Sequence, residues 1–165
     1  MRGGGTNNFA HRDDEDARSP VDHRPFAPKG RATMQRILVI DDDRAVRLTM
    51  QVILEDAGYE VICAVDGEEG LRMFDRAAPH LVITDIIMPN KEGLETIMQI
   101  RSRDSSTPII AISGGGRIHN GDFLDMAHRL GASEILAKPF NPQELAAVVR
   151  RLLSAREGKA LQRTA

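Results

Sequence analysis

Several short apolar segments of this sequence each end directly before a side chain that could take part in chemistry. Asp41 and Asp42 follow residues 37–40, Asp85 follows residues 81–84, Ser113 follows residues 109–112 and Lys138 follows residues 135–137. Apolar runs that stop at a charge or a hydroxyl are typical of buried parallel strands. Because ligands of such sheets bind at the carboxyl ends of the strands, we expect these side chains to converge.

Three carboxylates at one edge of a sheet would repel one another unless a cation lay between them. At an effective dielectric constant of about 20, two like charges ~4 Å apart repel by roughly 4 kcal/mol. Mg²⁺ suits this place, because it binds one or two carboxylates, keeps several waters and completes its shell with phosphate oxygens. The amine of Lys138 and the hydroxyl of Ser113 would suit the remaining phosphate oxygens.

Asp85 is the candidate for covalent chemistry, because a carboxylate can act as a nucleophile and form an acyl phosphate. It ends the strand that we expect at the centre of the sheet, and Met88-Pro89 turns the chain shortly after it. Each signal is weak when taken alone, and residues 41–43 would also fit a solvated cap before a helix. The prediction depends on their combination and order.

The spacing of apolar residues predicts the elements that position these side chains. Strands are expected at residues 36–40, 60–64, 81–84, 108–112 and 133–137. Helices are expected around the apolar stripes at residues 46–54, 71–74, 92–101, 121–130 and 145–153. Strands that alternate with helices predict an α/β fold, a doubly wound parallel sheet covered on both faces. Inward positions include Ile97, Ile100 or Met98 in the third helix, and Met126 and Ala127 in the fourth.

The composition divides the chain into three parts. Residues 1–33 carry an acidic run, three prolines and few aliphatic residues, so we expect a disordered extension. Met34 directly precedes the first strand and could be the true start of translation, in which case residues 1–33 would not belong to the protein. Residues 34–155 form the predicted domain, and residues 156–165 a short basic tail. A net charge of −2 gives no case for nucleic acid, and one cysteine forms no internal disulfide. Without an apolar run of about 20 residues, we expect a cytoplasmic location.

The sequence resembles the receiver domain of bacterial response regulators over residues 35–155. The resemblance is carried by Val39-Ile40-Asp41-Asp42-Asp43, Asp85-Ile86-Ile87-Met88-Pro89, Ala111-Ile112-Ser113-Gly114 and Ala137-Lys138-Pro139-Phe140. It implies a flavodoxin-like fold with strand order 2-1-3-4-5. It also implies a phosphorelay function, in which Asp85 accepts a phosphoryl group from a sensor histidine kinase or phosphotransfer protein.

The same resemblance implies roles for individual residues. Asp42, Asp85 and the backbone carbonyl of Ile87 would bind Mg²⁺ directly, and Asp41 would help through water. Ser113 and Lys138 would take the places of the switch hydroxyl and of the family's lysine. One departure is Ile135, where the family usually has an aromatic residue, so a switch should depend on Ser113 and the loop after it.

We further expect a switch that turns over no separate substrate. Little chain follows Leu153, so we expect no DNA partner, and the net charge and the lack of a long apolar run predict no membrane partner. The signal would leave through a protein partner at the face of the fourth helix, fifth strand and fifth helix, or through onward phosphotransfer in a relay. One alternative is a pseudo-receiver that binds its partner without phosphorylation. Another is an aspartate-nucleophile phosphohydrolase, which Ile87 argues against because that chemistry usually needs an acid two residues after the nucleophile.

Overall fold

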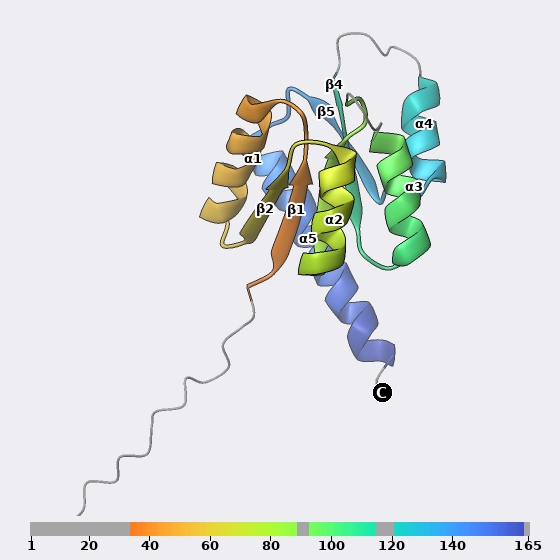
Figure 1. Ribbon diagram of the computed structural model, residues 1–165. Coiled ribbons are helices and arrows are strands. Elements are labelled where there is room, and N and C mark those ends of the chain that lie inside the picture. The colour runs from red at the N-terminus through yellow and green to blue at the C-terminus, as the bar shows by residue number, and fades with distance from the viewer. Residues whose placement is uncertain (1–33, 89–92, 115–120, 164–165) are drawn as a thin grey trace, which may run out of the picture. The chain divides into compact units, whose positions relative to one another are not determined.

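The computed structural model describes residues 34–88, 93–114 and 121–163. They form one parallel sheet with helices on both faces (Figure 1). The strands are β1 (Arg36–Ile40), β2 (Glu60–Ala64), β3 (Leu81–Asp85), β4 (Ile109–Gly114) and β5 (Glu134–Lys138). The helices are α1 (Arg44–Asp56), α2 (Gly67–Ala77), α3 (Gly93–Arg103), α4 (Gly121–Arg129) and α5 (Pro142–Arg163). The strand order β2-β1-β3-β4-β5 confirms the predicted fold.

The register of the central strands determines where their ends lie. β1 and β3 are hydrogen-bonded neighbours, and Ile40 pairs with Thr84. The residue after each of these is an aspartate, so the two acids leave the sheet at the same level. In β4 and β5 the pairing of Gly114 with Lys138 brings the lysine to this same edge. The chain order also reverses between β1 and β3, which is where sheets of this class bind ligands.

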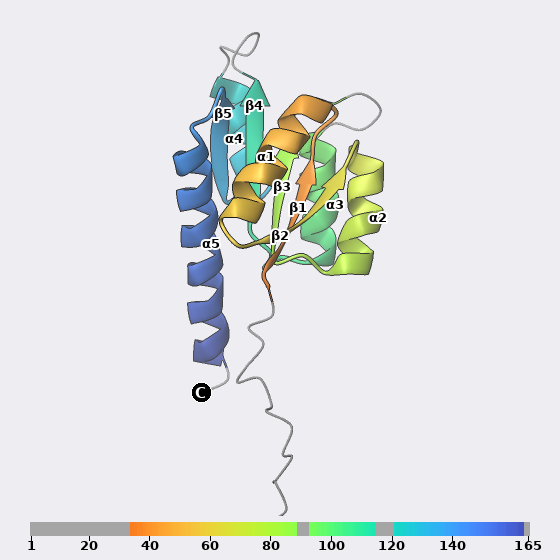
Figure 2. The same cartoon turned by 90° about the vertical axis from the view of Figure 1, so that its left-hand side faces the viewer.

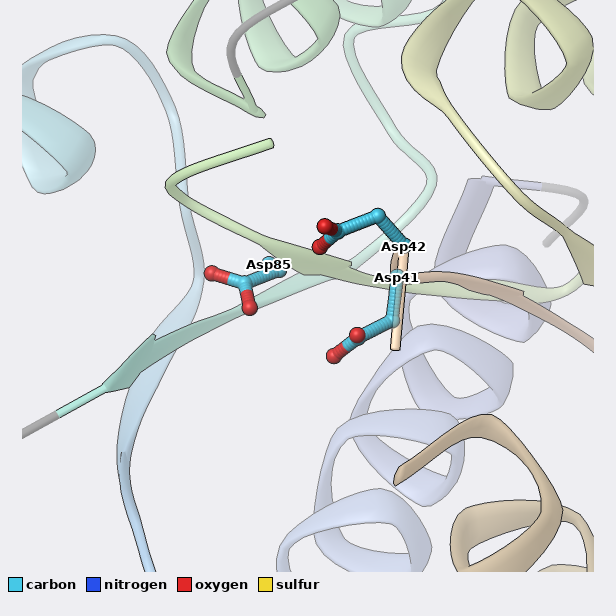
Figure 3. Close-up of side chains that lie close together, drawn as sticks. All are labelled: Asp41, Asp42 and Asp85. Atoms are coloured by element: carbon cyan, nitrogen blue, oxygen red, sulfur yellow. The ribbon is translucent and has the colours of Figure 1, made fainter. Parts of the chain in front are cut away.

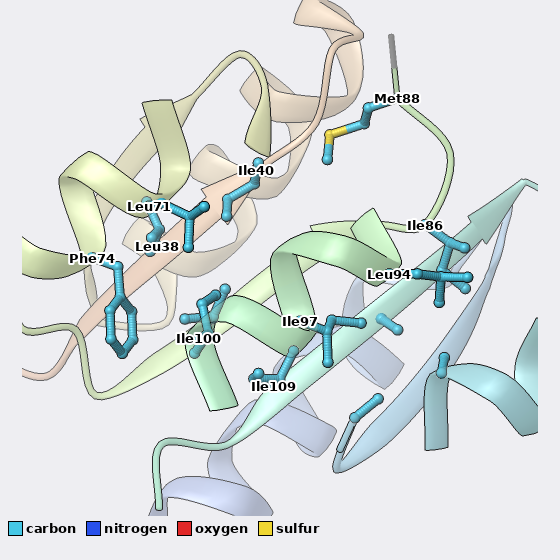
Figure 4. Packing of buried hydrophobic residues seen from close by; sticks show 14 of the residues in the cluster. Leu38, Ile40, Leu71, Phe74, Ile86, Met88, Leu94, Ile97, Ile100 and Ile109 are labelled. Carbon is cyan, nitrogen blue, oxygen red and sulfur yellow. The ribbon is translucent and has the colours of Figure 1, made fainter. Parts of the chain in front are cut away.

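Two apolar layers hold the helices on the sheet, because successive strand residues point to opposite faces. Leu38 and Ile40 belong to the layer under α2, α3 and α4, which Figure 4 shows. Ile37 and Val39 belong to the layer under α1 and α5, on the other face, as the turned view in Figure 2 shows. Full burial of each such side chain contributes about 1.5–3 kcal/mol.

Two of the expected inward positions differ in the structure. In α3, Ile97 and Ile100 are fully buried, and Met98 is 52% exposed. In α4, Ala127 is fully buried, whereas Met126 is 49% exposed, so its prediction was wrong. Adjacent helix positions are turned by about 100°, so an apolar pair in sequence need not share a face.

The first two helices begin at an aspartate cap, and α1 also ends beside a glycine. The Asp43 carboxylate accepts hydrogen bonds from the amides of Ala45 and Val46, and so caps α1. Gly58 follows the end of α1 with φ of 90°, a left-handed conformation that glycine adopts without strain. The Asp66 carboxylate accepts from the Glu69 amide at 2.8 Å and caps α2, as predicted.

The last helix is longer than its apolar stripe. The domain boundary expected at residue 155 falls inside α5, which continues to Arg163. Two hydrogen bonds hold this later part: Arg156 Nη1 donates to the His80 carbonyl at 2.6 Å, and Gln35 Nε2 donates to Glu157 Oε1 at 2.6 Å. These polar contacts connect α5 to the residues directly before β1 and β3.

Some expectations concern residues outside the described part of the chain. The extension predicted over residues 1–33 lies there, as does part of the loop after Ser113. Among the residues that are described, no helix has both the length and the apolar character that crossing a bilayer requires.

Candidate functional site

Three carboxylates gather at the ends of β1 and β3 (Figure 3). Asp41 and Asp42 directly follow β1, and Asp85 is the last residue of β3. One oxygen from each lies within 4.8 Å of the others. Asp41 and Asp85 are buried, whereas Asp42 is exposed to solvent. The cluster thus has two acids fixed in the protein and one at its open side.

Lys138, the last residue of β5, reaches this cluster from the opposite side of β4. Its Nζ lies 2.7 Å from Asp41 Oδ2 and 2.5 Å from Asp85 Oδ2. The remaining oxygens of both acids also have partners. The amide of Asp43 donates to Asp41 Oδ1 at 2.8 Å, and the amide of Ile87 donates to Asp85 Oδ1 at 3.0 Å. These contacts fix the orientation of both buried carboxylates.

The charges of the site are strongly coupled. Burial raises the pKa of the Asp41 carboxyl, and the hydrogen bonds from Lys138 and from the Asp43 amide offset only part of that increase. Burial lowers the pKa of the Lys138 ammonium, but its hydrogen bonds to Asp41 and Asp85 outweigh burial, so the net shift is upward. The lysine is therefore held in its charged form by two acids.

The donor set fits Mg²⁺. Every side-chain ligand in the cluster is a carboxylate oxygen, the ligand type that a hard divalent cation prefers. Asp42 has an exposed carboxylate, which leaves room for the waters that Mg²⁺ retains. The backbone amide of Ile87 donates a hydrogen bond to the Asp85 carboxylate, and Ile87 is 52% exposed. Its carbonyl was predicted as a ligand, and that role stays a prediction.

Ser113 is placed at the same edge of the sheet by β4. It lies between Ile112, which pairs with Asp85, and Gly114, which pairs with Lys138. Its side chain is buried, with 7% exposure. The structure therefore gathers Asp41, Asp42, Asp85 and Lys138 by direct contact or proximity, and positions Ser113 between the strands that carry the last two.

Two hydrogen bonds to Asp41, from the amide of Asp43 and from the side chain of Arg47, were absent from the sequence-based prediction. Asp43, which the prediction left outside the metal site, caps α1 while its own amide orients Asp41. Arg47 Nη1 donates to the backbone carbonyl of Asp41 at 2.5 Å, which ties the first full turn of α1 to the end of β1. The capping position of Asp43 before a helix was the available signal, whereas nothing in the sequence indicated the contact of Arg47.

An apolar hollow of about 440 Å³ lies between the start of α1 and the segment that follows β5. It is lined by Ala45, Val46, Thr49, Lys138, Pro139 and Phe140. On the other side of β5, Ile135 is partly buried and packs against the apolar layer under α2, α3 and α4. The position of the family's usual aromatic residue is therefore occupied by an aliphatic core side chain.

Comparison with known proteins agrees with this geometry. Residues 37–150 match the sequence profile of the response regulator receiver domain. The chain belongs to the response regulator receiver family. A solved receiver domain protein (CheY-like) from Methanospirillum hungatei has a TM-score of 0.72 and 28% identity to this receiver, covering 77% of this chain and 99% of that one.

Curated relatives of this receiver include longer proteins. A probable transcriptional regulator, ycf27, of Cyanophora paradoxa is 37% identical over 135 residues, which are 79% of this chain and 53% of that protein. The transcriptional regulatory protein CpxR of Escherichia coli is 37% identical over 122 residues, which are 73% of this chain and 50% of that protein. The chain thus spans about half the length of these relatives.

These relatives correct one prediction. The expectation that DNA is not a partner rested on the net charge and on the short segment after Leu153. It is wrong as an exclusion, because the relatives of this receiver are named transcriptional regulators. Because this chain spans only about half the length of these relatives, its net charge does not exclude DNA as a partner.

Proposed function

We propose that this receiver accepts a phosphoryl group on Asp85 from the phosphohistidine of a partner histidine kinase or phosphotransfer protein, in a Mg²⁺-dependent reaction. The observation that carries the proposal is the ion pair of Lys138 Nζ with both Asp41 and Asp85, at 2.7 and 2.5 Å. It gives one carboxylate a fixed orientation beside a second acid and a permanent cation. A phosphoryl acceptor in such a place has its charge compensated before transfer.

The transfer itself forms one bond and breaks another. A carboxylate oxygen of Asp85 attacks the phosphorus, so a P–O bond forms and the P–N bond to the partner's imidazole breaks. The electron pair of the broken bond returns to the imidazole nitrogen, and the product on this chain is an acyl phosphate. Slow attack by water then breaks the bond between the Asp85 oxygen and phosphorus, which returns the carboxylate and releases inorganic phosphate. No separate substrate is turned over.

Each neighbour of Asp85 has a distinct task in this proposal. Asp41, Asp42 and Asp85, with the Ile87 carbonyl, would hold Mg²⁺. When bound, the ion neutralises negative charge on the phosphoryl oxygens. The Lys138 ammonium adds a fixed positive charge from the β5 side. The Ser113 hydroxyl, at the end of β4, would donate to a phosphoryl oxygen.

The consequence of phosphorylation would be a change of conformer populations, not a new shape. The modification adds charge where Lys138 now pairs with two acids, so it alters the contacts of β5 with the ends of β1 and β3. That change would switch partner binding, or the phosphoryl group would pass on to another protein. We place this activity in the cytoplasm.

The test is labelling by acetyl phosphate in the presence of Mg²⁺, followed by intact-mass measurement. The protein should gain one phosphoryl group, and Asp85→Asn should abolish the gain while circular dichroism shows an unchanged fold. The matched control is Asp75→Asn in α2, which changes an exposed aspartate that pairs with Arg103 at 2.9 Å and lies outside the site. Full labelling of Asp85→Asn would refute the assignment of the acceptor.

The pseudo-receiver alternative gives a different result in the same experiment. It requires no labelling of the wild-type protein, and partner binding that neither Mg²⁺ nor Asp85→Asn affects. A partner isolated by affinity to the wild-type chain would therefore be titrated against both variants, with and without beryllofluoride as a stand-in for the phosphoryl group.

A further inference from the structure

Gly93, the first residue of α3, packs directly on the main chain of Asp85. A Cβ atom at this position would lie 1.7 Å from the Asp85 carbonyl oxygen and 2.7 Å from its carbonyl carbon. It would also lie 2.8 Å from Cα of Ile86. All three distances are below the 3.0 Å that real Cβ atoms keep. Because these are main-chain atoms, no side-chain rotation can relieve the overlap.

The main chain on both sides of this contact is held by hydrogen bonds. The Gly93 amide donates to the Ile86 carbonyl at 2.9 Å, and the Ile86 amide donates to the Ile112 carbonyl at 2.9 Å. The hydroxyl of Thr84, which is fully buried, donates to the Asp85 carbonyl at 3.1 Å. The carbonyl of Asp85 therefore lies between a helix start, a neighbouring strand and a buried hydroxyl.

We propose that Gly93 and Thr84 are positioning residues that fix the backbone of Asp85 and thereby aim its carboxylate at the metal and at Lys138. The inference rests on the function proposed for Asp85. A displaced Asp85 carbonyl carries the attached Cα and carboxylate with it, while Lys138 stays paired with Asp41 at 2.7 Å. A misplacement of about 1 Å in a reacting group can lower a rate about a hundredfold.

The chain offers a matched control in Gly70 of α2, which is also a buried glycine near the start of a helix. A Cβ there would meet Cδ1 of Ile40 at 2.4 Å. The next nearest atoms, Cγ1 at 2.9 Å and Cγ2 at 3.3 Å, also belong to the Ile40 side chain, so the overlap falls on a side chain and not on the main chain. Gly70→Ala thus crowds the core against a side chain, whereas Gly93→Ala crowds the main chain of Asp85.

The experiment compares Gly93→Ala with Gly70→Ala in two measurements, made at a temperature where urea unfolding shows both variants folded. Isothermal titration calorimetry gives the Kd for Mg²⁺, and acetyl phosphate labelling gives the initial rate of phosphorylation. Gly93→Ala should raise the Kd and lower the rate by about tenfold or more, because it moves a ligand and nucleophile. Gly70→Ala should leave both within about twofold. Equal effects of the two variants, or wild-type values for Gly93→Ala, overturn the proposal.

A second pair of variants applies if Gly93→Ala does not fold. Thr84→Val keeps the shape of the side chain and removes the hydroxyl that contacts the Asp85 carbonyl, whereas Thr84→Ser retains a hydroxyl. Thr84→Val should slow labelling and weaken Mg²⁺ binding severalfold, and Thr84→Ser should restore both. Equal values for the two variants contradict the positioning role.

The two measurements also separate this proposal from the proposed function. If the wild-type protein binds Mg²⁺ but is not labelled, phosphoryl acceptance fails, and the Kd values alone still decide whether Gly93 positions Asp85. If the wild-type protein is labelled at Asp85 and Gly93→Ala behaves as the wild type, the function stands and the positioning role fails.

Discussion

The ammonium nitrogen of Lys138 lies 2.7 Å from Oδ2 of Asp41, although 97 positions separate the two residues in the sequence. The same nitrogen contacts Asp85, so one cation joins the ends of β1, β3 and β5. Two buried acids depend on it. Among the residues that the structure describes, Lys138 is the cation that pairs with both buried acids of the site.

Removal of this cation should destabilise the protein in a pH-dependent manner. Lys138→Met leaves two buried carboxylates unpaired, at a cost of about 3 kcal/mol in the free energy of unfolding at pH 7. Burial already raises the folded-state pKa of Asp41 above its unfolded value, and the variant removes the group that opposes this. Such a group stabilises the fold below its unfolded pKa, and that contribution is lost as the pH rises through the folded pKa.

Urea unfolding of Lys138→Met between pH 3 and pH 8 measures this effect. The stability deficit should be small near the ordinary aspartate pKa of about 3.9 and full at pH 7. Addition of Mg²⁺ at pH 7 should restore part of the lost stability by supplying positive charge. A deficit that is independent of both pH and Mg²⁺ would instead indicate lost packing of the lysine side chain.

Adjacent aspartates should respond differently to the same substitution. Asp42→Ala should weaken Mg²⁺ binding with little loss of stability, and relief of repulsion should slightly stabilise the metal-free protein, because Asp42 is exposed. Asp43→Ala should cost about 1 kcal/mol of stability, since it removes the N-cap of α1, and should change Mg²⁺ affinity much less. Calorimetric titration of both variants measures the Mg²⁺ affinity, and thermal unfolding measures the stability. The reverse pattern would exchange the roles assigned to these residues.

Mg²⁺ should stabilise the wild-type protein by mass action. At a concentration one hundred times the Kd, a ligand that binds only the folded state contributes about 2.7 kcal/mol. For a domain of this size the melting temperature should then rise by roughly 5–10 °C. Scans with NaCl at matched ionic strength serve as the control, because an equal rise there would mean charge screening and not a specific site.

Asp104 provides a pH-dependent contribution far from the acidic cluster, at the other end of α3. Partial burial raises the pKa of Asp104, but hydrogen bonds from Ser106 and Thr107 outweigh it and lower the pKa well below its ordinary value. These bonds have lengths of 2.6 Å from the Ser106 amide and 2.5 Å from the Thr107 hydroxyl. A depressed pKa contributes stability above the unfolded pKa, and this stability is lost as the pH falls through the folded one.

Asp104→Asn should therefore lose about 2 kcal/mol at pH 7 relative to the wild type. The difference between the two proteins should narrow as the pH falls below the ordinary value of about 3.9. Urea midpoints across this range measure it, with the exposed change Asp75→Asn as a control. A stability difference that is the same at every pH would show that the asparagine side chain destabilises the protein through its shape and not through the lost charge.

The sequence was sufficient for the order of the elements and for the limits of the strands, but not for the end of α5, which continues to Arg163. Each apolar run became a strand, and the predicted ends differ by at most two residues, as in β4, which continues from 112 to Gly114. Strand order followed from the family resemblance. The convergence of Asp41, Asp85 and Lys138 was predictable too, because parallel strands deliver their carboxyl ends to one edge.

Other features depend on three-dimensional distances that no pattern encodes. The exposure of Met126 depends on which of two adjacent apolar residues faces the sheet. The hydrogen bond from Arg47 to the Asp41 carbonyl depends on the reach of a long side chain. The close approach of Gly93 to Asp85 spans a loop whose path the sequence leaves open. Such contacts arise from tertiary packing, so the three-dimensional structure is needed to identify them.

The late turn of α5 has a practical consequence for dissection of this protein. A fragment that stops at Ala155 would retain Leu145, Val149 and Leu153, which are buried residues of that helix. It would nevertheless lose Arg156 and Glu157, which form hydrogen bonds with His80 and Gln35, the residues directly before β3 and β1. A truncation chosen from the apolar stripe alone would thus remove both hydrogen bonds between α5 and the residues before β1 and β3. Expression boundaries are therefore better set beyond residue 157.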